Sequence, residues 1–186
     1  MGNLAVTYHN LGKYTEAEAL NIQVLDAWKR ILGVEHPDTI FAMGNLASSY
    51  SNLGKHTKAE TMKIQVLDAR KRILGVEHPD TIRAMANLAC SYRDLGKYTE
   101  AEKLEILVLD ARKRILGMQH PHTTLAMDNL AATLRSLRKY KEAEKLVIQA
   151  QFIGATSTHA SATMVNVQDA EETPILNFDK KGVYSG

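Results

Sequence analysis

Residues 85–126 read MANLACSYRDLGKYTEAEKLEILVLDARKRILGMQHPHTTLA, and this stretch occurs, with changes, at least three times in the chain. The copies begin at Met1, Met43 and Met85, and a fourth begins at Met127 and keeps the pattern as far as Gln149. Each start lies 42 residues after the one before. A fixed period of this size is typical of a helical solenoid, in which stacked units form long surfaces and not enclosed reaction centres.

The first helix of each repeat is predicted to open at a His-Pro pair and to close at a glycine. In the second copy, Pro37 suits the first helical turn, and Asp38 can accept hydrogen bonds from N–H groups that have no partner inside the helix. Gly54 can take the left-handed conformation that ends a helix. Between them, apolar residues at helical spacing predict one buried face: Ile40, Met43, Leu46, Ala47, Tyr50 and Leu53.

The second helix of the same copy is predicted to run from Thr57 to Gly75. Thr57 and Glu60 fit a capping box, in which each side chain bonds a backbone N–H at the other end of the first turn. Ala59, Met62, Ile64, Val66, Leu67, Ala69, Ile73 and Leu74 predict its buried stripe. Aspartate and arginine stand four residues apart in three copies and are expected to pair: Asp26–Arg30, Asp68–Arg72 and Asp110–Arg114. The fold class is therefore all-α, an α-solenoid of antiparallel helix pairs.

Composition restricts the classes of partner. Charged residues make up 24% of the chain and the net charge is +2, which is too balanced to indicate nucleic acid or a membrane surface. The one cysteine, Cys90, allows no internal disulfide, and the chain carries no signal peptide. These features predict an intracellular, cytoplasmic protein.

Neither an enzyme nor a metal or cofactor site is predicted. The His-Pro histidines are His36, His78 and His120, but packed helices lie roughly 8–10 Å apart, whereas zinc holds its ligands at about 2 Å. They are therefore interpreted as turn residues. Cys90 falls on the groove side of its helix without a histidine placed to activate it. Phosphate-binding glycine loops and nucleophile elbows are not found in the sequence.

The 42-residue period divides the chain into segments. We predict repeats at 1–42, with a truncated first helix, at 43–84, at 85–126 and at 127–153, where the second helix is shortened. Gly154 precedes Met164 by ten residues, as Gly117 precedes Met127. Residues 154–172 are therefore predicted to be a degenerate fifth repeat with a short capping helix, and 173–186 to be disordered. Because Met1 falls in the middle of a helix column, we hypothesise that the chain is a piece of a longer array.

The motif Asn-Leu-Ala-x-x-Tyr-x-x-Leu-Gly-Lys-Tyr-x-Glu-Ala-Glu, closed by Leu-Gly-x-x-His-Pro, resembles the tetratricopeptide repeat. Its 42-residue form resembles the repeats of kinesin light chains and of arrays at the C-terminus of some signalling NTPases. The resemblance covers about residues 1–150. It departs from the family at His56, which replaces a tyrosine, and at Leu134 and Arg138 in the fourth copy. The resemblance implies a right-handed superhelix whose concave side, lined by the first helix of each repeat, captures a partner peptide.

The resemblance also implies where such a peptide would bind. It places one asparagine per repeat in the groove, and further polar residues beside them: Asn3, Asn45, Asn87 and Asn129, with Asn10, Asn52, Arg83, Arg93 and Arg135. An asparagine amide can hold a peptide backbone, but it can equally bridge neighbouring helices. The arginines vary between copies and favour an acidic partner, although solvated surface arginines remain an alternative.

Three functions remain open. We favour a non-enzymatic scaffold that binds a partner protein or peptide, similar to a kinesin light chain. The alternative is the sensor or assembly portion of a larger signalling NTPase of the NB-ARC or NACHT type, whose ATPase domain would precede Met1. A heptad coiled coil before Met1 would instead indicate a motor adaptor. Simple end-to-end self-association of the array is the third possibility.

Overall fold

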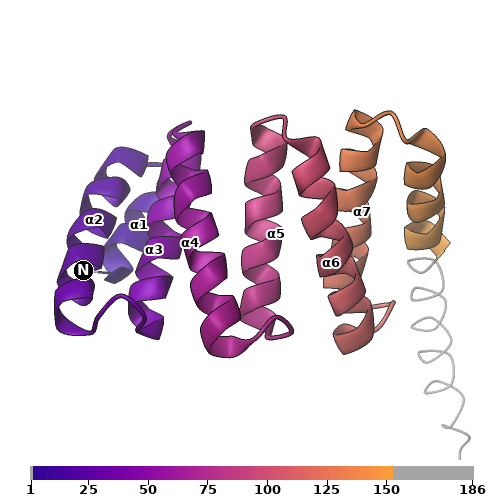
Figure 1. Cartoon of the computed structure of the whole chain (residues 1–186). Coiled ribbons are helices and arrows are strands. Elements are labelled where there is room, and N and C mark those ends of the chain that lie inside the picture. Colours follow the sequence, from indigo (N-terminus) through magenta and orange to yellow (C-terminus); the bar gives the residue numbers. More distant parts are fainter. Residues whose placement is uncertain (1, 153–186) are drawn as a thin grey trace, which may run out of the picture.

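The computed structural model describes residues 2–152, without the side chains of residues 2, 3 and 6. Helices stand side by side in chain order and alternate in direction, and no strand occurs among these residues (Figure 1). The helices are α1 (Gly2–Asn10), α2 (Tyr14–Ile31), α3 (Pro37–Asn52), α4 (His56–Leu74), α5 (Pro79–Asp94), α6 (Tyr98–Leu116) and α7 (Pro121–Ser136), followed by helical residues 140–152. The predicted all-α solenoid is confirmed. None of the described helices is long and apolar enough to cross a membrane.

Each odd-numbered helix ends in the same tight turn. In the second repeat, Gly54 has φ +70°, its N–H donates to the Ser51 carbonyl at 3.1 Å, and the Lys55 N–H donates to the Tyr50 carbonyl at 2.8 Å. These two bonds satisfy carbonyls that the end of a helix leaves without partners. Gly12 and Gly96 repeat the arrangement. Glycine therefore ends the first helix, as predicted, because the turn needs a positive φ.

The start of the even-numbered helices corrects a prediction. Helix α4 begins at His56, and its N-cap residue Lys55 makes no side-chain capping bond. Thr57 thus lies inside the first turn, and the predicted capping box with Glu60 does not form. The box does not form because the helix begins before Thr57: the Ala59 N–H already donates to the Lys55 carbonyl at 3.0 Å. The Glu60 carboxylate instead forms an ion pair at 2.6 Å with Lys97 of the next repeat.

Histidine, and not aspartate, caps the odd-numbered helices. The Nδ1 atoms of His36, His78 and His120 accept hydrogen bonds from the backbone N–H two residues later, at 3.2, 3.1 and 3.1 Å. The predicted capping role of Asp38 is therefore wrong, although each proline occupies the first turn as expected. The Thr39 hydroxyl, fully buried, donates to the Gly33 carbonyl at 2.7 Å and holds the loop against the helix.

One hydrophobic core runs through the described repeats. Alanines at equivalent positions are at most 1% exposed, so neighbouring helices approach closely: Ala17, Ala59, Ala101 and Ala143. Leu25, Leu67 and Leu109 fill the space between them, each 3% exposed. The buried stripe of the second helix is shorter than predicted. Ile73 and Leu74, at its C-terminal end, are 41% and 40% exposed and lie at an edge of the solenoid.

Ion pairs join consecutive repeats along the exposed surface. Lys55–Glu18, Lys97–Glu60 and Lys139–Glu102 are 2.6–2.7 Å apart, and Arg72–Glu35 and Arg114–Glu77 are 2.6 Å apart. The predicted Asp–Arg pairs within one helix are replaced by these contacts. Arg72 pairs with Glu35 in the loop between α2 and α3, and Arg114 pairs with Glu77 in the loop between α4 and α5. The Arg30 side chain bonds the backbone carbonyl of Asp26 instead of its carboxylate. Exposed pairs of this kind contribute little to stability, because water screens their charges.

Candidate functional site

Three cavities follow one another along one face of the solenoid, which we call the groove face. Each lies between two consecutive odd-numbered helices and is floored by the even-numbered helix between them. On this face, a cavity between α1 and α3 holds about 140 Å³, one between α3 and α5 about 220 Å³, and one between α5 and α7 about 10 Å³. Further cavities of about 240 and 340 Å³ lie toward the N-terminal ends of α3 and α5 and of α5 and α7. The repeats are alike in sequence, so the difference in size must come from the residues that vary.

A glycine opens the α3/α5 cavity. Gly44 lies on α3, and a Cβ added there would meet no other atom within 4 Å. Ala86 occupies the equivalent position in the next repeat and lines the cavity of about 10 Å³. Phe41 stands one turn before Gly44, and its side chain is 51% exposed. The α3/α5 cavity therefore has an open wall with an aromatic ring beside it.

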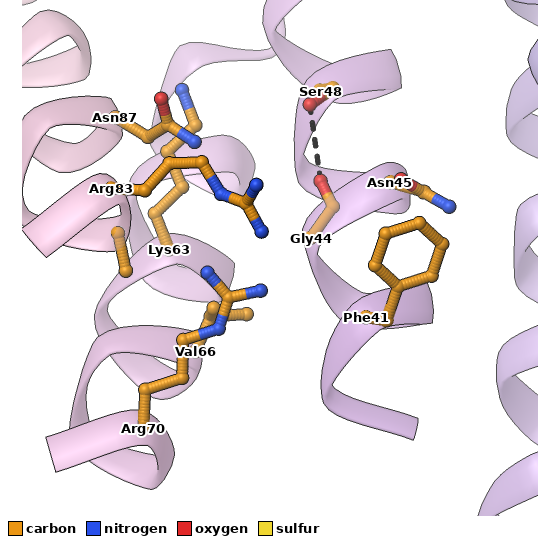
Figure 2. Close-up of a pocket in the computed structure, with 10 residues that line it drawn as sticks. Phe41, Gly44, Asn45, Ser48, Lys63, Val66, Arg70, Arg83 and Asn87 are labelled. Atoms are coloured by element: carbon orange, nitrogen blue, oxygen red, sulfur yellow. Dashed lines mark hydrogen bonds between the residues drawn. The ribbon is translucent and has the colours of Figure 1, made fainter. Parts of the chain in front are cut away.

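Three cations line the α3/α5 cavity, and no acidic side chain does. Figure 2 shows the guanidinium groups of Arg70 on α4 and Arg83 on α5 pointing toward the helix that carries Gly44, with Lys63 behind them. Arg70 donates to the Asp80 carbonyl at 2.9 Å, and Arg83 bonds the Asp80 carboxylate at 2.7 Å. Asp80 thus orients both arginines but neutralises only one charge.

Burial lowers the pKa values of two of these cations. Burial lowers the pKa of the Lys63 ammonium, and Cys90 and Asp94 offset only part of this effect. Burial also lowers the pKa of the Arg70 guanidinium, Asp80 raises it, and the like charge of Arg83 lowers it further. Both groups are partly desolvated cations, so an anion in the cavity would be attracted more strongly than at an open surface.

The α5/α7 cavity is closed by an internal ion pair. Arg93 Nε lies 3.5 Å from Glu105 Oε1, and Nη1 of Arg93 donates to the side-chain oxygen of Asn129 at 3.4 Å. Nη2 of the same guanidinium donates to Cys90 Sγ at 3.4 Å. The predicted groove arginine of the third repeat is therefore held by its own repeat and its neighbour.

The predicted site residues divide into three groups. Asn45, Asn87 and Arg83 line the α3/α5 cavity, where the structure brings them together. Asn129 lines the α5/α7 cavity and bonds Arg93, which is the helix-bridging role that the sequence left open. The remaining residues lie elsewhere. Asn10 ends α1, and Asn52 ends α3, where its side chain lies 3.3 Å from a ring nitrogen of His9. Arg135 is exposed near the end of α7. Asn3 lies in α1, and its side chain is not among those that the structure describes.

Sequence reasoning missed the floor of the groove. The resemblance assigned the groove to the first helix of each repeat, yet Lys63 and Arg70 come from α4. A signal was present, because the position of Lys63 carries Asn21, Lys63 and Glu105 in three otherwise similar copies. Within residues 2–152, no group of three or more His, Cys, Asp or Glu side chains is placed to hold a metal ion.

The comparisons with known proteins agree with this fold. A family model described as tetratricopeptide repeat matches residues 1–63, 41–113 and 91–151. A search of curated proteins by sequence finds no match.

Several solved structures are similar in fold. BtubC (BKLC) from P. vanneervenii matches with a TM-score of 0.78 and 18% identity, over 100% of this chain and 69% of that one. A putative kinesin light chain from Podospora anserina with nearly identical repeats matches at 0.56 and 22%, over 84% and 94%. PlcR from Bacillus thuringiensis, solved in complex with the peptide PapR7 and DNA, matches at 0.66 and 17%, over 86% and 57%. Identities this low establish the shared fold alone.

Proposed function

The chain belongs to the tetratricopeptide repeat family, and from that premise we propose that it is a non-enzymatic scaffold that binds an acidic peptide segment of a partner protein on its groove face. The α3/α5 cavity is the main anchor. The observation that carries the proposal is its lining, in which Lys63, Arg70 and Arg83 surround an open space of about 220 Å³ without an acidic side chain.

The chemistry of the cavity suits a carboxylate. Guanidinium groups bind carboxylates through paired hydrogen bonds, and the amides of Asn45 and Asn87 can both donate to and accept from a peptide backbone. The exposed Phe41 ring offers an apolar contact beside the charges. The PlcR structure, which contains a peptide, supports peptide binding as a use of this fold. The cavity is also preformed, which lowers the ordering cost of binding.

Filling the cavity tests the proposal. Peptides are first selected from a random phage-displayed library on the immobilised wild-type chain, and we expect them to share acidic residues. Gly44→Gln then places a neutral side chain in the cavity, where the added Cβ meets only open space. We expect this variant to bind the selected peptides at least about tenfold more weakly by fluorescence anisotropy, as for the loss of a charge-assisted contact.

The matched control is Ala86→Gln, at the equivalent position of the next repeat, where the cavity holds only about 10 Å³. It should bind the peptides as the wild type does. Both variants should keep their helical circular dichroism, because glutamine forms helices well. Failure of the wild-type chain to enrich any peptide, or equal binding by Gly44→Gln and the wild type, would contradict the proposed function.

A further inference from the structure

One residue position on the even-numbered helices forms the floor of all three cavities. It carries Asn21 on α2, Lys63 on α4 and Glu105 on α6. Successive members are 42 residues apart, so they occupy the same place in the repeat. The position therefore presents a neutral, a basic and an acidic side chain in turn at the base of the groove face. We call these three residues the floor column.

The first floor residue is neutral and is hydrogen-bonded to the next repeat. Asn21 is 5% exposed, and its side-chain Nδ2 donates to Ser49 Oγ at 3.1 Å. The α1/α3 cavity above it is lined by His9, Asn45 and Ser48 together with Ala5. An uncharged polar group of a ligand can form hydrogen bonds there, but no fixed charge selects for an anion.

The second floor residue carries a charge that forms no ion pair within the described residues and that Asp94 offsets only in part. Lys63 Nζ donates to Ser91 Oγ at 2.7 Å and to Ser51 Oγ at 3.0 Å. Both acceptors are neutral hydroxyls, so the hydrogen bonds of Lys63 within the described residues bring no negative charge to it. Hydrogen bonding is satisfied while charge is not, so the cavity retains a net attraction for an anion.

The third floor residue is neutralised within its own repeat. Arg93 occupies the position that Ser51 holds in the second repeat, and its guanidinium lies 3.5 Å from the Glu105 carboxylate. Arg93 and Glu105 thus cancel each other below the groove face. Ala86, in place of Gly44, narrows the opening above them. The α5/α7 cavity therefore offers little space, and the cation that lines it, Arg112, is engaged by the His122 backbone carbonyl at 2.8 Å.

We propose that the floor column, together with residues 51 and 93 opposite it, determines the order of charges that the groove accepts along a peptide. This inference rests on the proposed function. The groove takes an uncharged polar residue at α1/α3, an acidic residue at α3/α5, and has no acidic preference at α5/α7. Lys63 is the residue that determines specificity, and Glu105 keeps the neighbouring cavity from becoming a second anion site by holding Arg93.

Exchanging the two residue pairs tests the order. Ser51→Arg with Lys63→Glu transfers the third-repeat pair into the second repeat. Arg93→Ser with Glu105→Lys makes the reciprocal transfer. Each pair already exists at the equivalent place in this fold, which makes the exchanges matched controls for one another. Random phage-displayed peptides are selected on the wild type, on both double variants and on Lys63→Gln, after circular dichroism has shown which of them are folded.

We expect the wild type to enrich peptides with one acidic position. The Ser51→Arg/Lys63→Glu variant and Lys63→Gln should lose that preference and bind wild-type peptides about tenfold or more weakly. The reciprocal variant should gain a second acidic position further along the peptide. If folded Lys63→Gln keeps the wild-type acidic preference, the inference is overturned while the proposed function stands. If the wild type enriches no peptide, the proposed function fails as well.

Discussion

The carboxylate of Glu105 is buried without the hydrogen bonds that buried carboxylates normally have. The residue is 4% exposed, and neither carboxylate oxygen accepts a hydrogen bond from the described residues. The Thr133 hydroxyl lies beside it without hydrogen-bond geometry, and Arg93 contacts it at 3.5 Å. Burial raises the pKa of the Glu105 carboxyl, and Thr133 and Arg93 offset only part of that effect. The fold thus disfavours the charged form.

This raised pKa makes stability depend on pH in a defined direction. The folded chain binds the proton of Glu105 more tightly than the unfolded chain does, whose glutamate pKa is about 4.3. The free energy of unfolding therefore falls as the pH rises from that value through the higher folded pKa, and the loss persists at neutral pH. Below about pH 4 both states are protonated, and Glu105 contributes no such loss.

We predict that Glu105→Gln changes this profile. Relative to the wild type, the variant should gain stability as the pH rises from about 4 to 7, because its amide cannot ionise. Urea unfolding followed by circular dichroism at several pH values measures the difference between the two chains. A difference that moves the other way, with the wild type gaining on the variant toward pH 7, would show that Arg93 stabilises the charged carboxylate more than burial destabilises it.

At the scale of elements, the turn between α7 and the helix over residues 140–152 is the one described turn of its kind without glycine. Arg138 has φ +61°, the one positive φ among the described non-glycine residues. Its N–H still donates to the Arg135 carbonyl at 3.0 Å, and the Lys139 N–H to the Leu134 carbonyl at 2.9 Å. The geometry of the other turns is therefore kept at the expense of local strain, because a Cβ disfavours this conformation by roughly 1–2 kcal/mol.

Arg138→Gly should consequently stabilise the chain. Relief of the strain exceeds the extra freedom that glycine gives the unfolded chain, so we expect a net gain of up to about 1 kcal/mol. Thermal unfolding measures it, and Arg138→Ala is the control, since it removes the side chain but keeps the Cβ. Equal stability of the glycine and alanine variants would show that the positive φ at residue 138 does not strain a residue with a Cβ.

Sequence patterns predicted the position of each described helix but not how every helix begins. Glycines and prolines act through their own backbone geometry, so Gly54 and Pro37 could be interpreted from the sequence alone. The capping box at Thr57 was predicted wrongly, because the helix begins before Thr57 and the Ala59 N–H already donates to the Lys55 carbonyl. His36 caps through a ring nitrogen, which is an uncommon choice that residue statistics do not favour.

At the scale of the molecule, the fold followed from the period, but the groove did not follow from the family. Repeated columns such as Leu25, Leu67 and Leu109 pack the same way at each junction, so one repeat predicts the others. The groove depends on residues that differ between copies and on contacts between helices. Arg93 on α5 pairs with Glu105 on α6 and is therefore not free to bind a ligand. The spacing of residues along the sequence does not reveal such a contact between two helices.

The array should respond to damage locally, because extensive helix–helix contacts join only consecutive helices. Leu109→Ala removes a 3% exposed side chain from the third repeat, and truncations of this kind cost about 2–5 kcal/mol. In a linear array that loss should be largest in the damaged repeat and diminish with distance. Hydrogen exchange should therefore accelerate most in α5–α7 and least in α2.

Leu25→Ala, at the equivalent position of the first repeat, is the matched control and should show the opposite gradient. Equal acceleration of every helix by both variants would instead show that residues 2–152 unfold as one cooperative unit.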